Sequence, residues 1–278
     1  MIRIITDSTC DLTKADQEKL GITVIPLQVL FGTTHYTDGI DLSVEAFYQK
    51  LETEKELPTT TQINPDTFIN AFEEYLKQGD EIIAILLSSH LSGTYQSAVI
   101  AKEMLETDKI HLIDSQNVTL GLALLVGEAS KLRDQGLSAS EIVDEIELLK
   151  NKVKLIAIVD TLKYLQKGGR ISAASAVVGT ALGIKPIVQV KDGIVQVLGK
   201  ERGQKKMYKF IAHYLEEHQI DTQYCVVFAH SMAETSLKSL KEMIEEKYNI
   251  NDNRTVCIGS TVGTHVGPGA VGVAFIAK

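Results

Sequence analysis

Short apolar runs alternate with amphipathic stretches along the first part of the chain. Residues 2–6, 82–87 and 110–113 are apolar runs of strand length, and each is followed by polar turn residues. Residues 64–78 repeat their large apolar side chains at helical spacing, which predicts an amphipathic helix. Strands that alternate with helices indicate an α/β fold with a mostly parallel, doubly wound sheet, of which residues 155–159 are the last predicted strand.

The segment after the first predicted helix is apolar as well. Residues 22–31 are β-branched and apolar enough to predict a single strand. Residues 32–39 are polar and contain two glycines, so we expect a loop there. A helix is predicted to follow over residues 42–51.

The pattern changes in the C-terminal part of the chain. Residues 186–190 and 194–198 are apolar strands separated by residues 191–193 (KDG), a hairpin signal that a purely parallel sheet does not contain. A helix of small residues is predicted over residues 173–183. The sequence therefore predicts two domains. They are a mostly parallel α/β domain over residues 1–160 and a mixed α/β domain over residues 161–278.

Two hydroxyl-rich loops stand next to predicted helix starts. Residues 88–97, which include Gly93, connect an apolar run with a helix, and residues 58–62 precede another helix. The first amides of a helix favour an anion, and open α/β sheets collect ligands at the carboxyl ends of their strands. We therefore expect both loops to converge on a phosphate or a carboxylate. The alternative is that Ser92 or Thr94 only caps a helix.

A third loop is predicted at residues 260–269, which are rich in glycine and contain His265. The backbone can approach a ligand closely there, and the imidazole can donate to an anion. The alternative is a solvated loop histidine. A hydrolase built from Ser92, His265 and Asp7 is a second alternative, because all three residue types of a catalytic triad are present.

Composition excludes several classes of partner and cofactor. The net charge of −8 argues against nucleic acid and anionic membranes, while 44% hydrophobic residues suffice for large cores. The three cysteines are widely spaced, and the chain contains no P-loop, no G-x-S-x-G and no H-E-x-x-H, so we expect neither a metal nor a cofactor. A carboxylate, Asp7, precedes any apolar run of signal-peptide or membrane-spanning length, which predicts a cytoplasmic protein.

Basic residues gather in two places of this acidic chain. Residues 167–170 (KGGR) form one cluster, and Lys200, Arg202, Lys205 and Lys206 form the other. Such runs are usually solvated surface. The alternative is a site for an acidic partner or a phosphate, since the planar fork of arginine suits contact with two oxygens.

Five stretches, in their order and spacing, resemble the DegV family of bacterial lipid-binding proteins. They are residues 5–12 (ITDSTCDL), 58–62 (PTTTQ), 88–97 (SSHLSGTYQS), 167–171 (KGGRI) and 267–269 (GPG). The resemblance extends over essentially the whole chain. The family pattern usually reads PTTSQ, so Thr61 replaces a serine and retains its hydroxyl.

The resemblance implies a two-domain protein that buries one long-chain fatty acid between its domains. Some members of the family are the acyl-carrying subunit of bacterial fatty acid kinase, and present the carboxylate to a separate ATP-binding subunit that makes acyl phosphate. The carboxylate contacts that the resemblance implies are Thr60 or Thr61, Ser92 with Gly93, and nearby His265. Arg170 and Arg202 are implied to face the kinase. An esterase or thioesterase that uses Ser92 remains the alternative.

Overall fold

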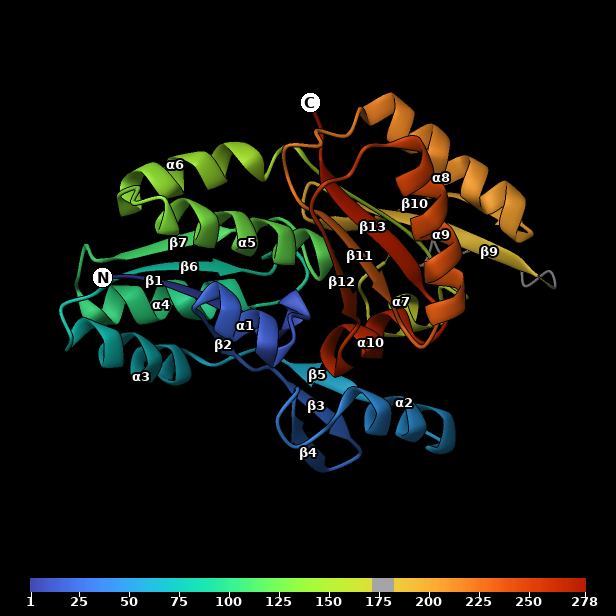
Figure 1. Cartoon of the computed structure of the whole chain (residues 1–278). Helices are drawn as coiled ribbons and strands as arrows, with labels where there is room; N and C mark the ends of the chain where they lie inside the picture. Colours follow the sequence, from blue (N-terminus) through green and yellow to red (C-terminus); the bar gives the residue numbers. More distant parts are fainter. Residues whose placement is uncertain (172–182) are drawn as a thin grey trace.

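The computed structural model describes residues 1–171 and 183–278. The predicted fold class is confirmed: the chain forms an α/β structure with one parallel and one mixed sheet. Figure 1 shows the parallel sheet between two layers of helices, with the mixed sheet beside it and a small third sheet below. The predicted helix over residues 173–183 falls almost entirely on residues that lie outside the described ones.

The parallel sheet has the strand order β2-β1-β6-β7. Its strands are β1 (Ile2–Asp7), β2 (Ile22–Ile25), β6 (Glu81–Leu86) and β7 (Ile110–Asp114). The helices around it are α1 (Lys14–Leu20), α3 (Pro65–Leu76), α4 (Thr94–Leu105), α5 (Leu120–Asp134) and α6 (Ala139–Leu149). Alternate residues of β1 and β6 enter different cores, Ile4 and Ile83 on one face and Ile5 and Ile82 on the other. Both faces are therefore apolar, as a doubly wound sheet requires.

The mixed sheet has six strands in the order β10-β9-β8-β13-β11-β12. They are β8 (Val153–Ile158), β9 (Ile184–Lys191), β10 (Ile194–Arg202), β11 (Val226–His230), β12 (Asn253–Cys257) and β13 (Val271–Ile276). The predicted hairpin is confirmed, because β9 and β10 pair in antiparallel register. The prediction that residues 155–159 end the first sheet is wrong, since β8 pairs with β9 and β13. An apolar run shows that a strand is buried and leaves its partner undetermined.

Helices cover the outer face of the mixed sheet, and its inner face turns toward α5. The remaining helices are α7 (Lys163–Lys167), α8 (Gln204–His218), α9 (Glu234–Lys247) and α10 (Ser260–Val266). Side chains of α8 and α9 pack on Ile156, Phe228 and Phe275. Leu155 and Val190 belong to the core that contains α5. The predicted glycine-rich loop at residues 260–269 is partly helical, because α10 begins at Ser260.

A third sheet consists of β3 (Gln28–Phe31), β4 (Thr34–Thr37) and β5 (Thr59–Thr61), and α2 (Val44–Thr53) packs against it. The single strand predicted over residues 22–31 is wrong, because the chain leaves β2 at Ile25 and begins β3 in another sheet. Pro26 lies at the break and has no amide proton to donate to a ladder. The loop predicted over residues 32–39 contains β4, which pairs with β3.

A buried carboxylate joins the carboxyl ends of β1 and β6. Asp7 Oδ2 accepts from the Leu87 amide at 2.8 Å, and Oδ1 accepts from the Thr9 amide at 3.0 Å and the Thr9 hydroxyl at 2.6 Å. Complete burial raises the pKa of Asp7 to about 6 in spite of these donors. Asp7 therefore fixes two loops that lie next to each other at the edge of the parallel sheet.

Candidate functional site

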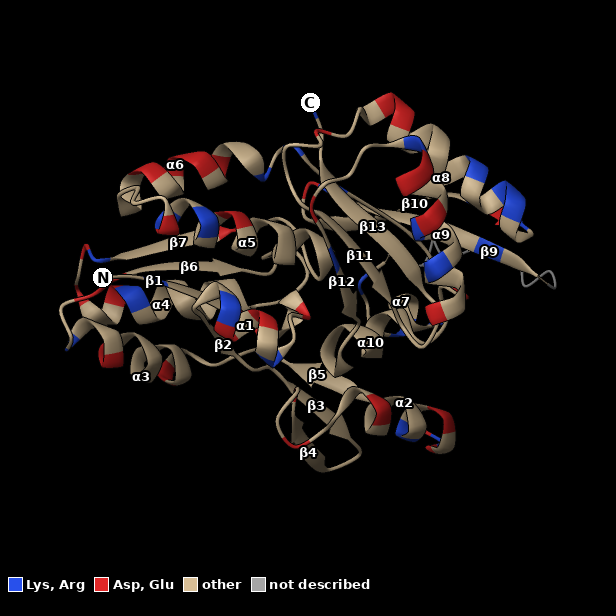
Figure 2. Cartoon of the chain, viewed as in Figure 1, with Lys and Arg blue, Asp and Glu red and all other residues tan. Residues whose placement is uncertain are grey.

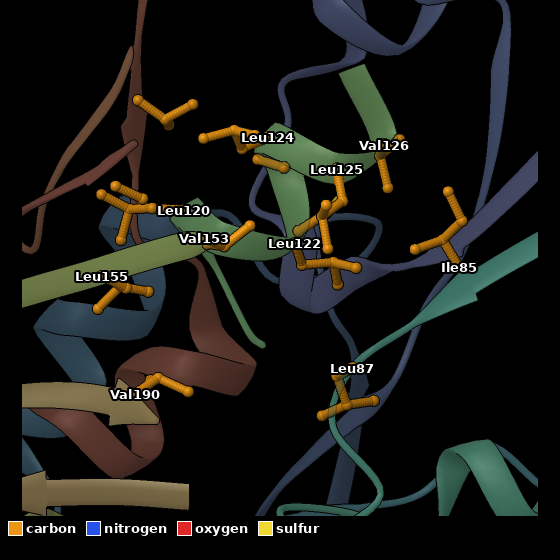
Figure 3. Packing of buried hydrophobic residues seen from close by; sticks show 14 of the residues in the cluster. Ile85, Leu87, Leu120, Leu122, Leu124, Leu125, Val126, Val153, Leu155 and Val190 are labelled. Carbon is orange, nitrogen blue, oxygen red and sulfur yellow. The ribbon is translucent and has the colours of Figure 1, made fainter. Parts of the chain in front are cut away.

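A cavity lies between that edge of the parallel sheet and the inner face of the mixed sheet. About 880 Å³ of space, open solvent at the mouth included, lies between its lining atoms. Figure 3 shows four of the lining side chains, Leu87, Leu120, Leu155 and Val190, each from a different segment. Most of the wall is aliphatic, so it favours an apolar occupant.

The floor of the cavity contains two of the smallest side chains of the mixed sheet. Gly272 of β13 and Ala157 of β8 are register partners, and both line the cavity. A Cβ at Gly272 would approach the Ala157 Cβ to 2.9 Å and the Ile156 carbonyl oxygen to 3.0 Å. Larger side chains at this pair would occupy the space that the cavity now leaves open.

Polar side chains meet at one end of the cavity. We call this the polar end; it consists of Thr60, Ser92, Arg170 and His265, which all line the cavity. Thr60 Oγ1 and His265 Nε2 are 2.9 Å apart and join β5 to α10. When Nε2 carries the ring proton and donates it to Thr60, the hydroxyl proton of Thr60 is available to a ligand.

A similar relay orients the hydroxyl of Ser92. Thr94 Oγ1 accepts from the Ile63 amide and lies 3.0 Å from Ser92 Oγ, which also accepts from the Thr94 amide. When the Thr94 hydroxyl donates to Ser92 Oγ, the hydroxyl proton of Ser92 is free to be donated to a ligand in the cavity. The two predicted loops therefore converge, and Ser92, which accepts from the first amide of α4, lines the cavity.

Gly93 keeps these two loops close together. A Cβ at Gly93 would lie 2.0 Å from Gln62 Oε1, and the Gln62 amide nitrogen donates to Ser97 Oγ across the same contact. Gly93 itself does not line the cavity. Its role in this structure is to let residues 58–62 approach α4.

Burial and a neighbouring cation keep His265 neutral. Desolvation, and to a smaller extent the positive charge of Arg170, lower the pKa of His265 to about 4. Gly168 makes room for the ring, since a Cβ there would lie 2.2 Å from His265 Nδ1. The imidazole therefore acts at neutral pH as a hydrogen-bonding group without net charge.

Arg170 contributes the positive charge of the polar end. Its Nε donates to the Leu91 carbonyl at 3.0 Å, and its Nη1 donates to the Gly168 carbonyl at 2.5 Å. Partial burial lowers the pKa of the guanidinium. Neutral carbonyls hold its position without cancelling its charge, so the guanidinium attracts an anion.

The other predicted site residues lie elsewhere. Thr61 does not line the cavity, because neighbouring residues of β5 point to opposite faces and Thr60 points inward. Arg202 is exposed at the end of β10 and away from the cavity wall. The triad alternative is not assembled: His265 bonds Thr60, Ser92 bonds Thr94, and Asp7 bonds Thr9 and Leu87.

Sequence reasoning missed three threonines in the wall. Thr9, Thr119 and Thr261 line the cavity, and the Oγ1 atoms of Thr119 and Thr261 are buried without a hydrogen-bond partner in the described parts of the chain. Thr9 belongs to a short helical turn, η1 (Ser8–Cys10), directly after β1. Thr261 lies one helical turn before His265, so the two side chains share a face of α10. Predicting α10 as a helix would therefore have indicated Thr261 as a neighbour of His265.

Two kinds of feature are absent from residues 1–171 and 183–278. These residues contain no group of three or more His, Cys, Asp or Glu side chains placed to hold a metal ion. They also include no helix with both the length and the apolar character needed to cross a membrane.

The whole chain is similar to one known family. A family model described as "Uncharacterised protein, DegV family" matches residues 1–278. A DegV domain-containing protein of Caldanaerobacter subterraneus is 38% identical over 278 residues, which are 100% of this chain and 99% of that protein. Another, from Clostridium perfringens, is 39% identical over 267 residues, 96% of this chain and 95% of its own.

Solved structures of similar chains share the fold. A DegV family protein from Thermus thermophilus, described as fatty acid binding, superposes with a TM-score of 0.91 at 29% identity, covering 100% of this chain and 99% of its own. DegV from Bacillus subtilis, described as a fatty acid binding protein, has a TM-score of 0.87 at 33% identity with the same coverage.

We predict that His265 stays neutral between pH 5.5 and 8. A folded pKa of about 4, below the ordinary 6.5, means that the unfolded chain takes up the proton first. The contribution of this group to stability is therefore complete above pH 6.5 and is lost as the pH falls toward 4. Ring-nitrogen NMR across this range, with His265→Gln to assign the signal, measures the titration. A midpoint near 6.5 would contradict the described environment.

Proposed function

Because this chain belongs to the DegV family, we propose that its cavity binds one long-chain fatty acid with the carboxylate at the polar end. The observation that carries the proposal is the segregation of the wall, in which oriented donors meet at one end of an otherwise largely aliphatic cavity. Two structural neighbours described as fatty acid binding share the fold.

The tail supplies most of the affinity. At roughly 0.8 kcal/mol per buried CH₂, about fifteen methylenes give on the order of 12 kcal/mol before the cost of association. Each hydroxyl donor to the carboxylate adds about 1.5–3 kcal/mol. The donors of the polar end therefore fix the position of the head group, and the aliphatic wall retains the molecule.

We propose further that the protein presents the carboxylate to a separate ATP-binding kinase subunit in the bacterial cytoplasm, in phospholipid metabolism. The chain has no nucleotide-binding motif of its own, so the ATP would have to be held by a partner. In this proposal the hydroxyls of Thr60 and Ser92 donate to the carboxylate, the neutral His265 orients the hydroxyl of Thr60, and Arg170 supplies the positive charge beside them.

The partner surface proposed here is basic. Figure 2 shows Lys and Arg gathered at the N-terminal end of α8, next to the end of β10, whereas α6 is rich in Asp and Glu. Arg202 ends β10 and is exposed, so it can contact an acidic kinase surface. Arg170 is half-buried at the polar end and also lines a surface hollow outside the cavity.

Ser92→Ala tests the carboxylate site. Loss of one hydrogen bond to a charged group should weaken binding of hexadecanoate about tenfold and leave the affinity for methyl hexadecanoate nearly unchanged. Isothermal titration of both ligands measures the difference. Ser89→Ala, in the same loop but exposed and outside the cavity, is the matched control. Equal loss for acid and ester would show that Ser92 only supports the loop.

Arg202→Glu tests the docking surface. We expect it to slow the kinase-dependent formation of acyl phosphate at least tenfold, and more at low salt, because charges at a contact rim steer association over about a Debye length. The lipid content of the purified protein should not change. Lys238→Glu on α9 alters the net charge equally and should have no effect. If Arg202→Glu also loses lipid, Arg202 supports the cavity and the docking assignment is wrong.

A further inference from the structure

A surface hollow adjoins the polar end of the cavity from outside. We call it the outer groove; it is lined by residues 55–60, by Tyr164 and Lys167 of α7, by Gly168 and Arg170, and by Thr264 and His265 of α10. Thr60, Arg170 and His265 line both the cavity and the outer groove. The two spaces therefore adjoin at these three residues, and a head group bound among them lies next to both.

The outer groove is positively charged in a chain of net charge −8. Its charged lining residues are Lys55, Lys167, Arg170 and a single carboxylate, Glu56. Residues 172–182, which follow this region in the chain, contain no Asp or Glu. The described acceptors of Arg170 are both backbone carbonyls, so its charge remains available to a ligand.

The cavity and the outer groove differ in the charge that they tolerate. The cavity is aliphatic apart from its hydroxyls, its neutral imidazole and Arg170, and a dianion there would lose most of its hydration. A phosphate group carries a charge of about −1.5 to −2 at pH 7. The exposed lysines of the outer groove can neutralise that charge while water still reaches it.

We infer that the outer groove is a phosphate site: Lys55, Lys167 and Arg170 hold the phosphoryl group of an acyl phosphate whose chain lies in the cavity. The inference rests on the proposed function. In the transfer, a carboxylate oxygen bonds to the γ-phosphorus of the ATP held by the partner kinase. The bond from that phosphorus to the bridging oxygen breaks, and ADP leaves with the electron pair. The product, the acyl phosphate, stays next to Thr60, and its phosphoryl group contacts Lys55, Lys167 and Arg170 in the outer groove.

The test compares three C16 ligands that differ only in the head group: hexadecanoate, hexadecanol and hexadecyl phosphate, which is a stable analogue of the acyl phosphate. We expect the wild type to bind hexadecyl phosphate more tightly than hexadecanoate, and hexadecanol least tightly. Lys55→Gln and Lys167→Gln should each lower the affinity for hexadecyl phosphate about fivefold, as the loss of an exposed ion pair does. Each should change the affinity for hexadecanoate less than twofold. Lys238→Gln is the control for net charge.

Salt and free phosphate identify the source of the anion. Raising NaCl from about 50 to about 500 mM should lower the affinity for hexadecyl phosphate, and should lower it more in the wild type than in the Lys55→Gln, Lys167→Gln double variant. Inorganic phosphate alone should compete only at millimolar concentration, because it lacks the chain. Competition at micromolar concentration would assign the groove to free phosphate and overturn the inference.

The outcomes separate this inference from the proposed function. If hexadecanoate binds but the lysine variants leave hexadecyl phosphate unchanged, the outer groove is not a phosphate site, and the fatty acid proposal stands. If the variants lower the affinity for both ligands equally, the lysines support the fold and the outer groove is not a phosphate site. If neither ligand binds, both proposals are wrong.

Discussion

The hydrogen bond between Thr60 and His265 connects residues 205 positions apart in the chain. It ties the small sheet, through β5, to α10 at the polar end of the cavity. The rest of the wall includes strands of the mixed sheet and segments that follow β1 and β6 of the parallel sheet. Gly168, which has no side chain, leaves room for the ring, and burial keeps the imidazole neutral. A protonated ring would place two charges, His265 and Arg170, against each other in a partly desolvated site.

The segregation of polar and apolar atoms in the cavity wall fits the proposed ligand, a hydrocarbon chain with a charged head group. The carboxyl ends of parallel strands carry the polar loops, fixed by the buried carboxylate of Asp7, which holds Thr9 and Leu87 in place. The inner face of the mixed sheet supplies aliphatic side chains and, at Ala157 and Gly272, the space for the tail.

Much of this could be predicted from the sequence, because local patterns determine local structure. Strand and helix alternation predicted the fold class, and hydroxyls beside helix starts indicated the two loops from which Thr60 and Ser92 line the cavity. The predictions that were wrong or left open concern features that depend on contacts between distant segments of the chain. The sheet to which β8 belongs is set by pairing with β13, whose Val271 lies 113 residues after its register partner Ile158. The choice of Thr60 over Thr61 is set by which face of β5 meets α10. Arg170, which the resemblance implied to face the kinase, lines both the cavity and the outer groove, and its docking role stays a prediction.

The most direct measurement is native mass spectrometry of the purified protein together with its Ala157→Phe variant. The account predicts that the wild type carries one fatty acid per chain. The variant, whose larger side chain fills the floor of the cavity opposite Gly272, should fold with the same circular dichroism and carry none. A wild-type protein without lipid, which also fails to take up added hexadecanoate, would contradict the account, as would a folded Ala157→Phe variant that retains the full complement of fatty acid.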